Sequence, residues 1–455
     1  MKVAEIVKIT QGKLLSGSLN ADIDTSKILT DSRTAAKGSF FVALTGPNFN
    51  GNNFVESAFE KGAVGAIITR REACGLWLGK IVILVKDSTK ALQQIASAHR
   101  RKFKIPVIAV TGSNGKTTAK DMIAACLSKK YRVLKNEGTK NNHIGVPQTL
   151  LQLKPGHQAC VLELGTNHKG EIRDLSAIAR PTVAIITNIG PSHLESLGDL
   201  DGVYEAKKEI LDFLDKKGTI VLNGDDKYLS RIKGGRRKIV RYGFKGSNAF
   251  YAEGLLPPRK GRLTFVVNKK MVFELNIVGR HNIYNALAAI AVADHFKISH
   301  KLIREALVGY RPASKRLDIK RINGIDIIDD SYNSNPLSMM CALETIKHYP
   351  ANARWVVAGD MLELGRGTVR FHRSIGEAIA RSNVDGILTF GEFSRHILSR
   401  ALECGMKKEK LWHCPDHEAI TGILKRIVKK GDVVLLKGSR GMKMEEVLNK
   451  LKGQK

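Results

Sequence analysis

Short, fully apolar segments alternate with helical segments through most of this 455-residue chain. Four of them stand in the middle of the chain: VIAV (107–110), ACVLELG (159–165), TVAIITNIG (182–190) and GTIVLNGDD (218–226). Strands that are apolar at every position are buried on both faces, which is typical of parallel sheets flanked by helices. The chain is therefore predicted to be an α/β protein.

Changes in this pattern divide the chain into three predicted domains. Residues 1–103 combine an apolar strand, a Gly/Asn-rich loop and two helices, the second of which is predicted to be capped by Ser88. Residues 104–312 contain the parallel sheet and, over 262–279, a predicted hairpin or short meander. Residues 313–455 again alternate strands and helices, which predicts a smaller Rossmann-like domain.

Composition narrows the class of protein. No run approaches the roughly 18 apolar residues of a membrane helix, and the first residues lack the apolar core of a signal peptide. None of the six cysteines forms a CxxC pair, so a reduced cytoplasm is expected. The net charge of +31 favours anionic partners, including nucleotides, nucleic acid and acidic lipid surfaces. The basic residues are spread out without interleaved aromatic residues, so nucleic-acid binding is not expected.

The segment AVTGSNGKTTAKDM (109–122) joins an apolar strand to a helix, as a phosphate-binding loop does. Its glycines free backbone N–H groups to surround phosphate oxygens, and the helix N-terminus adds a positive dipole end. Lys116 supplies a charge for the β- and γ-phosphates, and Thr117 can place its hydroxyl on Mg²⁺. Unlike the familiar loop, its glycines are separated by two residues rather than four. The predicted nucleotide-binding residues of the loop are Gly112, Ser113, Asn114, Gly115, Lys116, Thr117 and Thr118.

Two polar residues follow buried strands, where open α/β sheets bind ligands. Glu163 lies at the end of ACVLELG, and a carboxylate there can hold Mg²⁺ directly or through water. His193 lies in the loop after TVAIITNIG. A lone histidine is more often not a ligand, so the residue type alone does not make His193 a metal site.

One lysine of the segment GVYEAKKEILDFL lies on an apolar helical face. Lys207 shares that face with Ile210, Leu211 and Leu214, whereas Lys208 lies off it. Such a lysine either extends outward to solvent or is buried with a lowered pKa. A neutral amine can take up CO₂ and become an anionic carbamate, which can bind Mg²⁺.

The shortened loop, together with these segments, resembles the Mur ligase family, which also includes folylpolyglutamate synthetases. Members use ATP to join a carboxylate to an amine, and the resemblance runs from about Thr30 to about Leu448. It implies ATP, two Mg²⁺ ions and a carbamylated Lys207. The implied metal ligands are Thr117, Glu163, His193 and Lys207. The implied catalytic residues are Lys116, Lys207, His193 and Arg316.

Two further segments match family motifs. VGRHNIYNALAAIAVA resembles the adenine-contacting segment, with His281, Asn282 and Asn285 at the matching positions, although Asn282 could instead cap a helix. SKRLDI carries Arg316, which matches the hinge arginine that reaches the ATP phosphates when the last domain closes. Lys315 stands where most members have glycine.

Four segments in order favour one branch of the family. They are NNHIGVPQTLL (141–151), DDSYNSNPLSM (329–339), GDMLELG (359–365) and KGSRGMKMEEVL (437–448). They resemble the branch whose members add D-alanyl-D-alanine to UDP-N-acetylmuramoyl-tripeptide, and the resemblance implies an acyl phosphate intermediate and a role in peptidoglycan precursor synthesis. The alternatives are the ligase that adds lysine or a diamino acid, whose Asp-Asn-Pro-Arg motif is absent, and a folylpolyglutamate synthetase, which the second and third segments disfavour.

The resemblance also implies where the substrates bind. The first domain is expected to hold the uridine diphosphate end, and the third to bind the dipeptide and close on ATP. The implied substrate residues are Asp31, Ser32, Arg33, Asn142, Tyr332, Asn333 and Asn335, and Asp330 is implied in nucleotide binding. A polar turn is the alternative for residues 31–33, and the roles of residues 330–335 are not divided. The family implies a cytoplasmic monomer.

Overall fold

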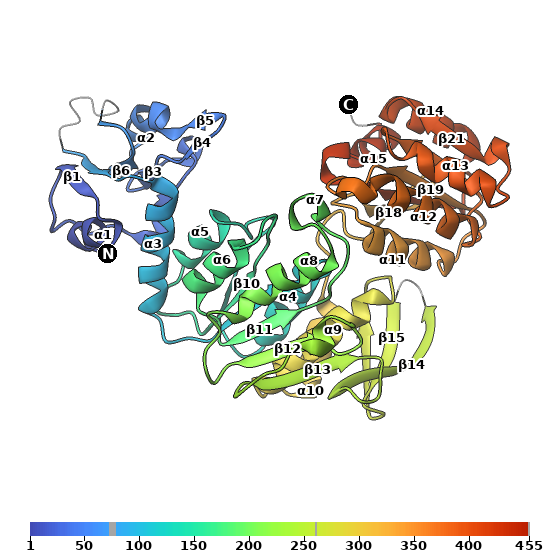
Figure 1. Ribbon diagram of the computed structural model, residues 1–455, viewed down its shortest axis with the longest axis horizontal. Coiled ribbons are helices and arrows are strands. Elements are labelled where there is room, and N and C mark those ends of the chain that lie inside the picture. The colour runs from blue at the N-terminus through green and yellow to red at the C-terminus, as the bar shows by residue number, and fades with distance from the viewer. Residues whose placement is uncertain (72–78, 260–261, 454–455) are drawn as a thin grey trace.

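The computed structural model describes residues 1–71, 79–259 and 262–453. Three main sheets follow one another along the chain, and the second lies between and below the other two in the view of Figure 1. Each sheet is mainly parallel and is flanked by helices, so the predicted α/β class with three domains is confirmed. We call the parts built on these sheets the N-terminal, central and C-terminal units.

The N-terminal unit is built on a five-stranded sheet in the order β1-β7-β6-β3-β2. Its first strand is antiparallel to β7, and the other pairs are parallel. The strands are β1 (Lys13–Ser16), β2 (Ile28–Leu29), β3 (Phe40–Val42), β6 (Gly65–Ile68) and β7 (Ile81–Leu84), with a separate ribbon of β4 (Thr45–Gly46) and β5 (Phe49–Asn50). The helices are α1 (Val3–Thr10), α2 (Val55–Glu60) and α3 (Ser88–Arg101).

The cap of α3 differs from the prediction. Asp87, rather than Ser88, is the N-cap residue, and its side chain accepts a hydrogen bond from the backbone N–H of Lys90. A carboxylate caps as well as a hydroxyl and also interacts favourably with the helix dipole. Ser88 is the first helical residue, and its buried hydroxyl has no hydrogen-bond partner among the described residues.

The central unit holds a nine-stranded sheet in the order β16-β15-β14-β13-β12-β11-β8-β10-β9. Strands β9 to β14 pair in parallel, and β15 and β16 form the predicted antiparallel hairpin. The strands are β8 (Val107–Thr111), β9 (Val133–Lys135), β10 (Ala159–Glu163), β11 (Val183–Ile186), β12 (Thr219–Asn223), β13 (Lys238–Gly243), β14 (Phe250–Arg259), β15 (Arg262–Val267) and β16 (Met271–Leu275). The helices are α4 (Lys116–Leu127), α5 (Gly145–Leu150), α6 (Glu171–Ala179), α7 (Leu194–Leu197), α8 (Leu200–Lys208), α9 (His281–His295) and α10 (His300–Gly309).

Both faces of the central sheet are buried, which explains why its strands are apolar at every position. Val107 and Ala109 of β8 belong to one hydrophobic core, whereas Ile108 and Val110 belong to another. Successive side chains of a strand point to opposite faces, so each face has its own core. The first core also contains residues of the N-terminal unit, and α3 contacts α1 on one side and α5 and α6 on the other.

The C-terminal unit holds a six-stranded sheet in the order β17-β18-β22-β19-β20-β21. The pairs are parallel except for β17, an edge strand that the sequence patterns did not predict. The strands are β17 (Asp318–Ile322), β18 (Ile325–Asp330), β19 (Arg354–Gly359), β20 (Gly386–Phe390), β21 (Leu411–Cys414) and β22 (Val433–Lys437). The helices are α11 (Pro336–Lys347), α12 (Thr368–Ala380), α13 (Arg395–Glu403), α14 (His417–Ile427) and α15 (Glu445–Leu451).

Two further findings concern the predictions from composition. Within the described residues, no helix is both long enough and apolar enough to cross a membrane. Five cysteines in the described part of the chain are free, and Cys74 lies outside the described residues.

Candidate active site

The predicted phosphate loop lies between β8 and α4, at the carboxyl edge of the central sheet. Gly112 and Gly115 have φ angles of 141° and 80°, which L side chains rarely adopt. A Cβ atom at Gly112 would lie 2.0 Å from Thr187 Oγ1, and one at Gly115 would lie 2.4 Å from Asn285 Oδ1. The two glycines are therefore required by backbone conformation and by neighbours that approach the loop closely.

The loop after β11 fixes the shape of the phosphate loop. Ser113 N and Asn114 N donate to the backbone and side-chain oxygens of Asn188, each at 2.9 Å. Thr187 Oγ1 donates to Asn114 O at 2.5 Å. The sequence analysis missed Thr187 and Asn188, although both belong to the segment that follows β11. They preorganise the loop, because its backbone is already held before any anion arrives.

The side chain of Lys116 folds back onto the phosphate loop. Its Nζ donates to Gly112 O at 2.8 Å and to Ser113 O at 3.2 Å. Burial lowers the pKa of Lys116, while the nearby Glu163 carboxylate raises it and Arg316 lowers it further. The ammonium group is therefore held where an anionic ligand of the loop would be neutralised.

Replacing Gly115 with alanine should weaken nucleotide binding. The new methyl group would strain the left-handed backbone at a cost of about 1–2 kcal/mol and would also displace the Asn285 amide. We expect calorimetry to give an ADP dissociation constant raised at least about tenfold. Gly170→Ala is the matched control, since Gly170 has a φ of 91° but open space around its Cβ position. Equal losses of ADP affinity in both variants would contradict the close-approach argument.

Glu163 is a buried carboxylate with two neutral partners. Its Oε2 accepts a hydrogen bond from Thr117 Oγ1 at 2.6 Å, and its Oε1 accepts one from Asn141 Nδ2 at 2.8 Å. The predicted pair Thr117 and Glu163 is thus in direct contact. Asn142, the predicted substrate residue of this segment, is exposed and accepts hydrogen bonds from the backbone N–H groups of Ile144 and Gly145.

Lys207 and His193 lie close enough to the phosphate loop for the charge of Lys116 to lower the pKa of both. Lys207 is only 1% exposed, and burial lowers its pKa well below the ordinary value, with Lys116 lowering it further. Its neighbour Lys208 is on the surface and forms an ion pair with Glu205 at 2.8 Å. The interpretation of Lys207 as the buried lysine is therefore confirmed, and the outward-extending alternative is wrong.

His193 lies where the central unit meets the C-terminal unit. Burial lowers its pKa, and the cations Lys207 and Lys116 lower it further. Its Nδ1 lies 2.6 Å from Oε2 of Glu363, a residue of the C-terminal unit. Across the described ranges, no three His, Cys, Asp or Glu side chains converge in a way that could hold a metal ion by themselves.

Helix α9 presents two amide side chains near the loop. Asn282 Nδ2 donates to Val278 O at 2.7 Å, and Asn285 Nδ2 donates to Asn282 Oδ1 at 3.0 Å. Asn282 is not the helix cap, because Arg280 holds that position. His281 packs against Gly279, and burial lowers the pKa of His281 to about 4. These contacts support the predicted grouping of the Asn282 and Asn285 amides.

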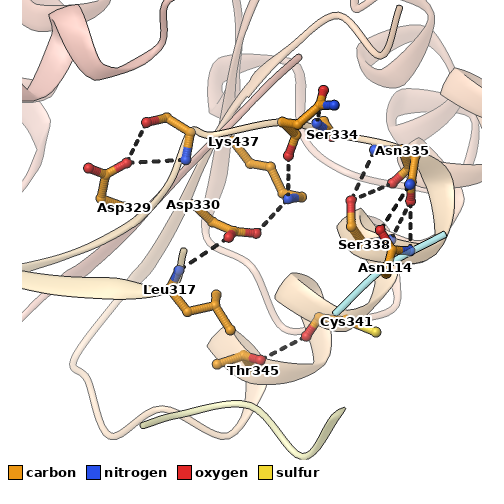
Figure 2. A network of polar contacts seen from close by, with 12 residues as sticks. Asn114, Leu317, Asp329, Asp330, Ser334, Asn335, Ser338, Cys341, Thr345 and Lys437 are labelled. Carbon is orange, nitrogen blue, oxygen red and sulfur yellow. Dashed lines mark hydrogen bonds and ion pairs between the residues drawn. The ribbon is translucent and has the colours of Figure 1, made fainter. Parts of the chain in front are cut away.

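The loop after β18 joins the C-terminal unit to the phosphate loop, as Figure 2 shows. The Asn114 and Asn335 amides exchange hydrogen bonds at 2.9 and 3.1 Å (Figure 2). Asn335 Oδ1 also accepts from Ser338 N at 2.8 Å, so the same amide caps α11. The contact thus links the capped N-terminus of α11 in one unit to the phosphate loop of the other.

Asp330, the last residue of β18, forms the centre of a second polar cluster beside this loop. It stands opposite Lys437 in the parallel pairing of β18 and β22, and the buried Lys437 Nζ donates to Asp330 Oδ2 and to Asn333 O (Figure 2). Asp330 Oδ1 accepts from Leu317 N at 3.1 Å. Asp330, implied in nucleotide binding, therefore also anchors the hinge. Lys437 was missed, although it is the first residue of the quoted segment KGSRGMKMEEVL.

The hinge contains Arg316, whose guanidinium group stacks on the Tyr332 ring at 3.9 Å from the ring centroid. Its neighbours Lys315 and Leu317 have φ angles of 64° and 51°. Glycine adopts this conformation without strain, which is a physical reason to expect glycine before the arginine. Here Lys315 is held instead by an ion pair with Glu445 at 2.8 Å.

Residues 31–33 form a polar turn of the N-terminal unit in which Ser32 is buried and Arg33 is exposed. Asp31 caps the turn and binds Arg33 through both carboxylate oxygens, which lowers the pKa of Asp31 to about 2. The preceding Thr30 accepts a hydrogen bond from Gln148 of α5 at 2.9 Å. The turn therefore lies beside the segment of Asn142, and its role in substrate binding stays a prediction.

A cavity of about 590 Å³ lies between the central and C-terminal units. Predicted residues that line it are Ser113, Asn114, Gly115, Lys116, Thr117, Thr118, Glu163, His193, Asn282, Asn285, Arg316, Asp330, Tyr332, Asn333 and Asn335. Its lining does not include Gly112, Lys207, Asp31, Ser32, Arg33 or Asn142. Residues from segments more than 200 positions apart thus share one cavity.

The preorganised phosphate loop at the carboxyl edge of a parallel sheet, facing a Rossmann-like unit across this cavity, defines a class: nucleotide-dependent α/β enzymes whose substrates meet between domains. Comparison with known proteins names the family. Residues 110–293 match the Mur ligase middle domain, and residues 315–440 match the Mur ligase glutamate ligase domain. The chain belongs to the Mur ligase family, as predicted, and is an ATP-dependent ligase.

Individual relatives are similar to this chain over nearly its full length. The UDP-N-acetylmuramoyl-tripeptide--D-alanyl-D-alanine ligase of Bacillus subtilis (strain 168) is 37% identical over 453 residues, covering 99% of this chain and 98% of the relative. A crystal structure of MurF from Acinetobacter baumannii is 31% identical with a TM-score of 0.89, covering 100% and 99% of the two chains. MurF from Thermotoga maritima in complex with ADP is 27% identical with a TM-score of 0.85, covering 95% and 99%.

Proposed function

We propose that this chain adds D-alanyl-D-alanine to UDP-N-acetylmuramoyl-tripeptide, with ATP activating the tripeptide carboxylate as an acyl phosphate. The observation that carries the proposal is the cavity that joins the phosphate loop to residues 330–335 of the C-terminal unit. The names of the Bacillus subtilis and Acinetobacter baumannii relatives support the choice of substrates. Peptidoglycan precursor synthesis is the corresponding process.

ATP would bind with its phosphates on the loop and its base near α9. Lys116 and the backbone N–H groups at the start of α4 offer positive charge to the phosphates. Asn282, Asn285 and Asp330 are the proposed nucleotide contacts outside the loop, and Arg316 is the proposed hinge cation. The ADP complex of the Thermotoga maritima relative supports a nucleotide at this family's site.

The donor atoms near the loop fit Mg²⁺. Thr117 Oγ1 and Glu163 Oε2 are hard oxygen donors only 2.6 Å apart, and Mg²⁺ typically takes few protein ligands beside phosphate oxygens. We propose Thr117 and Glu163 for one ion, and Glu163, His193 and carbamylated Lys207 for the second. Bound Mg²⁺ would supply neutralisation of the developing phosphate charge.

Lys207 fits a metal site only after modification, since an ammonium group has no lone pair to donate. Its neutral amine would attack CO₂ to form an N–C bond and lose one proton, which leaves an anionic carbamate. The carbamate would also offset the charge of Lys116, which lowers the pKa of Lys207 and of His193 in the present arrangement.

Two steps follow from this arrangement. Lys116 would hold the γ-phosphoryl oxygens while a tripeptide carboxylate oxygen forms a bond to phosphorus and ADP leaves. The C-terminal unit would then hold the dipeptide amine against the acyl carbon, where a C–N bond forms, the amine proton is lost and phosphate departs. Closure between the units would exclude water, which otherwise hydrolyses an acyl phosphate.

The substrate ends are assigned to the outer units. We propose Asp31, Ser32, Arg33 and Asn142 for the UDP-sugar end, supported by the contact of Thr30 with Gln148 beside them. Tyr332, Asn333 and Asn335 are proposed for the dipeptide side. The proposed boundaries remain 1–103, 104–312 and 313–455, and the working unit is proposed to be a cytoplasmic monomer.

Phosphate release from ATP tests the proposal. Purified protein with Mg²⁺ should release phosphate only when UDP-N-acetylmuramoyl-tripeptide and D-alanyl-D-alanine are both present. Mass spectrometry should find a product heavier than the tripeptide substrate by the dipeptide minus water. Release that requires a single amino acid or a folate instead would reject the substrates, and tight nucleic-acid binding without turnover would reject the enzyme.

A further inference from the structure

The contact between His193 and Glu363 joins the central unit to the C-terminal unit. His193 immediately precedes α7, and Glu363 lies in the loop that follows β19. Besides the 2.6 Å side-chain contact, Glu195 N donates to Glu363 O at 3.2 Å. Gly365 approaches so closely that a Cβ atom there would lie 3.3 Å from Glu195 Cα. The segments around His193 and Glu363 therefore contact each other through both backbone and side-chain atoms.

Both residues of the pair have strained backbones. The φ angles are 52° at His193 and 63° at Glu363, and neither residue is glycine. A left-handed conformation costs an L residue roughly 1–2 kcal/mol, and such strain concentrates at functional sites. Two strained residues on separate units point their side chains at each other, which indicates that the meeting of these side chains matters.

The contact between His193 and Glu363 contributes too little to the stability of the fold to explain why these residues are placed together. The Glu363 side chain is 55% exposed and that of His193 is 22% exposed. An exposed ion pair of this kind typically contributes at most about 1 kcal/mol, because water and salt screen it. That contribution is no larger than the strain at either residue, so orientation of the imidazole is the better explanation.

A metal-binding histidine commonly donates its second ring N–H to a carboxylate, which fixes the tautomer and the orientation of the ring. Glu363 Oε2 lies 2.6 Å from Nδ1, close to that position although the two groups are not aligned as a hydrogen bond, and His193 lines the same cavity as Thr117 and Glu163. We infer that Glu363 is a positioning residue that leaves His193 Nε2 free for Mg²⁺, so that docking of the C-terminal unit completes the metal site. The inference rests on the metal site of the proposed function.

Manganese binding tests the inference independently of turnover. Electron paramagnetic resonance with Mn²⁺ and ADP would give the metal dissociation constant for the full-length protein. Glu363→Ala should raise this constant about 10- to 100-fold, and Glu363→Gln less, since its amide oxygen can still accept from Nδ1. The melting temperature should not change. Glu195→Gln, in the facing helix α7, is the matched control and should retain full Mn²⁺ affinity.

A double-mutant cycle separates positioning from direct ligation. In a His193→Ala background, Glu363→Ala should have no further effect on Mn²⁺ affinity, because the residue acts through the imidazole. A further loss there would mean that Glu363 binds the metal itself, which overturns the inference. Unchanged affinity in the single variant Glu363→Ala also overturns it. If the wild type fails to form the ligation product but Glu363→Ala still weakens Mn²⁺ binding, the positioning role stands and the substrate proposal fails.

Discussion

Replacing Lys116 with methionine should lower the maximal rate of phosphate release about 10²- to 10³-fold. Methionine has a similar length and volume, so the variant removes the charge and leaves the packing of the loop largely intact. Lys116 Nζ donates hydrogen bonds to the carbonyl oxygens of Gly112 and Ser113, at 2.8 and 3.2 Å. Its charge matters most when charge develops on the transferring phosphoryl group, so kcat should fall more than the affinity for ADP.

Steady-state kinetics and ADP calorimetry on the same preparation check this expectation. Lys129→Met is the matched control, because Lys129 lies just beyond the far end of α4 and forms an ion pair with Glu305 at 3.4 Å. It should retain wild-type kcat. If Lys116→Met raises KM for ATP at unchanged kcat, the lysine contributes only to ground-state binding, and the assigned role in phosphoryl transfer is wrong.

Replacing Lys207 with alanine should also lower kcat about 10²- to 10³-fold, with activity partly restored by formate or acetate. Lys207 is fully buried, and burial lowers its pKa well below the ordinary range. More of the amine is therefore neutral near neutral pH, and only the neutral amine can take up CO₂. Removing the side chain leaves space in which a small carboxylate can replace the carbamate.

Two measurements check the role of Lys207. The intact mass of the wild type should decrease by one CO₂ on acidification, because a carbamate loses CO₂ when protonated. Lys208→Ala is the matched control, since its side chain is 42% exposed and paired with Glu205. It should keep wild-type activity. Full activity of Lys207→Ala without an added carboxylate would reject the carbamate.

Features that depend on neighbouring residues could be predicted from the sequence. The apolar strands around VIAV predicted the buried parallel sheet, because both faces of β8 are covered. The spacing of Lys207 from Ile210 and Leu214 predicted its burial, and all three side chains are buried, although α8 ends at Lys208 and does not continue to Leu214. Ser88 failed as a cap because Asp87, one residue earlier, offers a stronger acceptor at the same end of the helix.

The joining of the units required the tertiary structure. Asn114 meets Asn335 across 221 positions, and Lys437 meets Asp330 only because β18 and β22 pair in one register. Glu363 belongs to the quoted segment GDMLELG, but nothing in that segment indicated its contact with His193, which lies in the central unit.

The sequence by itself determined the α/β class, the phosphate loop and the family, because these depend on local periodicity and on short segments that match as they stand. Only the tertiary structure decided which side chains share the cavity and which pairs bridge the central and C-terminal units. The reason is physical: the packing of three separate sheets sets those distances, and no local spacing encodes how far apart two sheets come to rest.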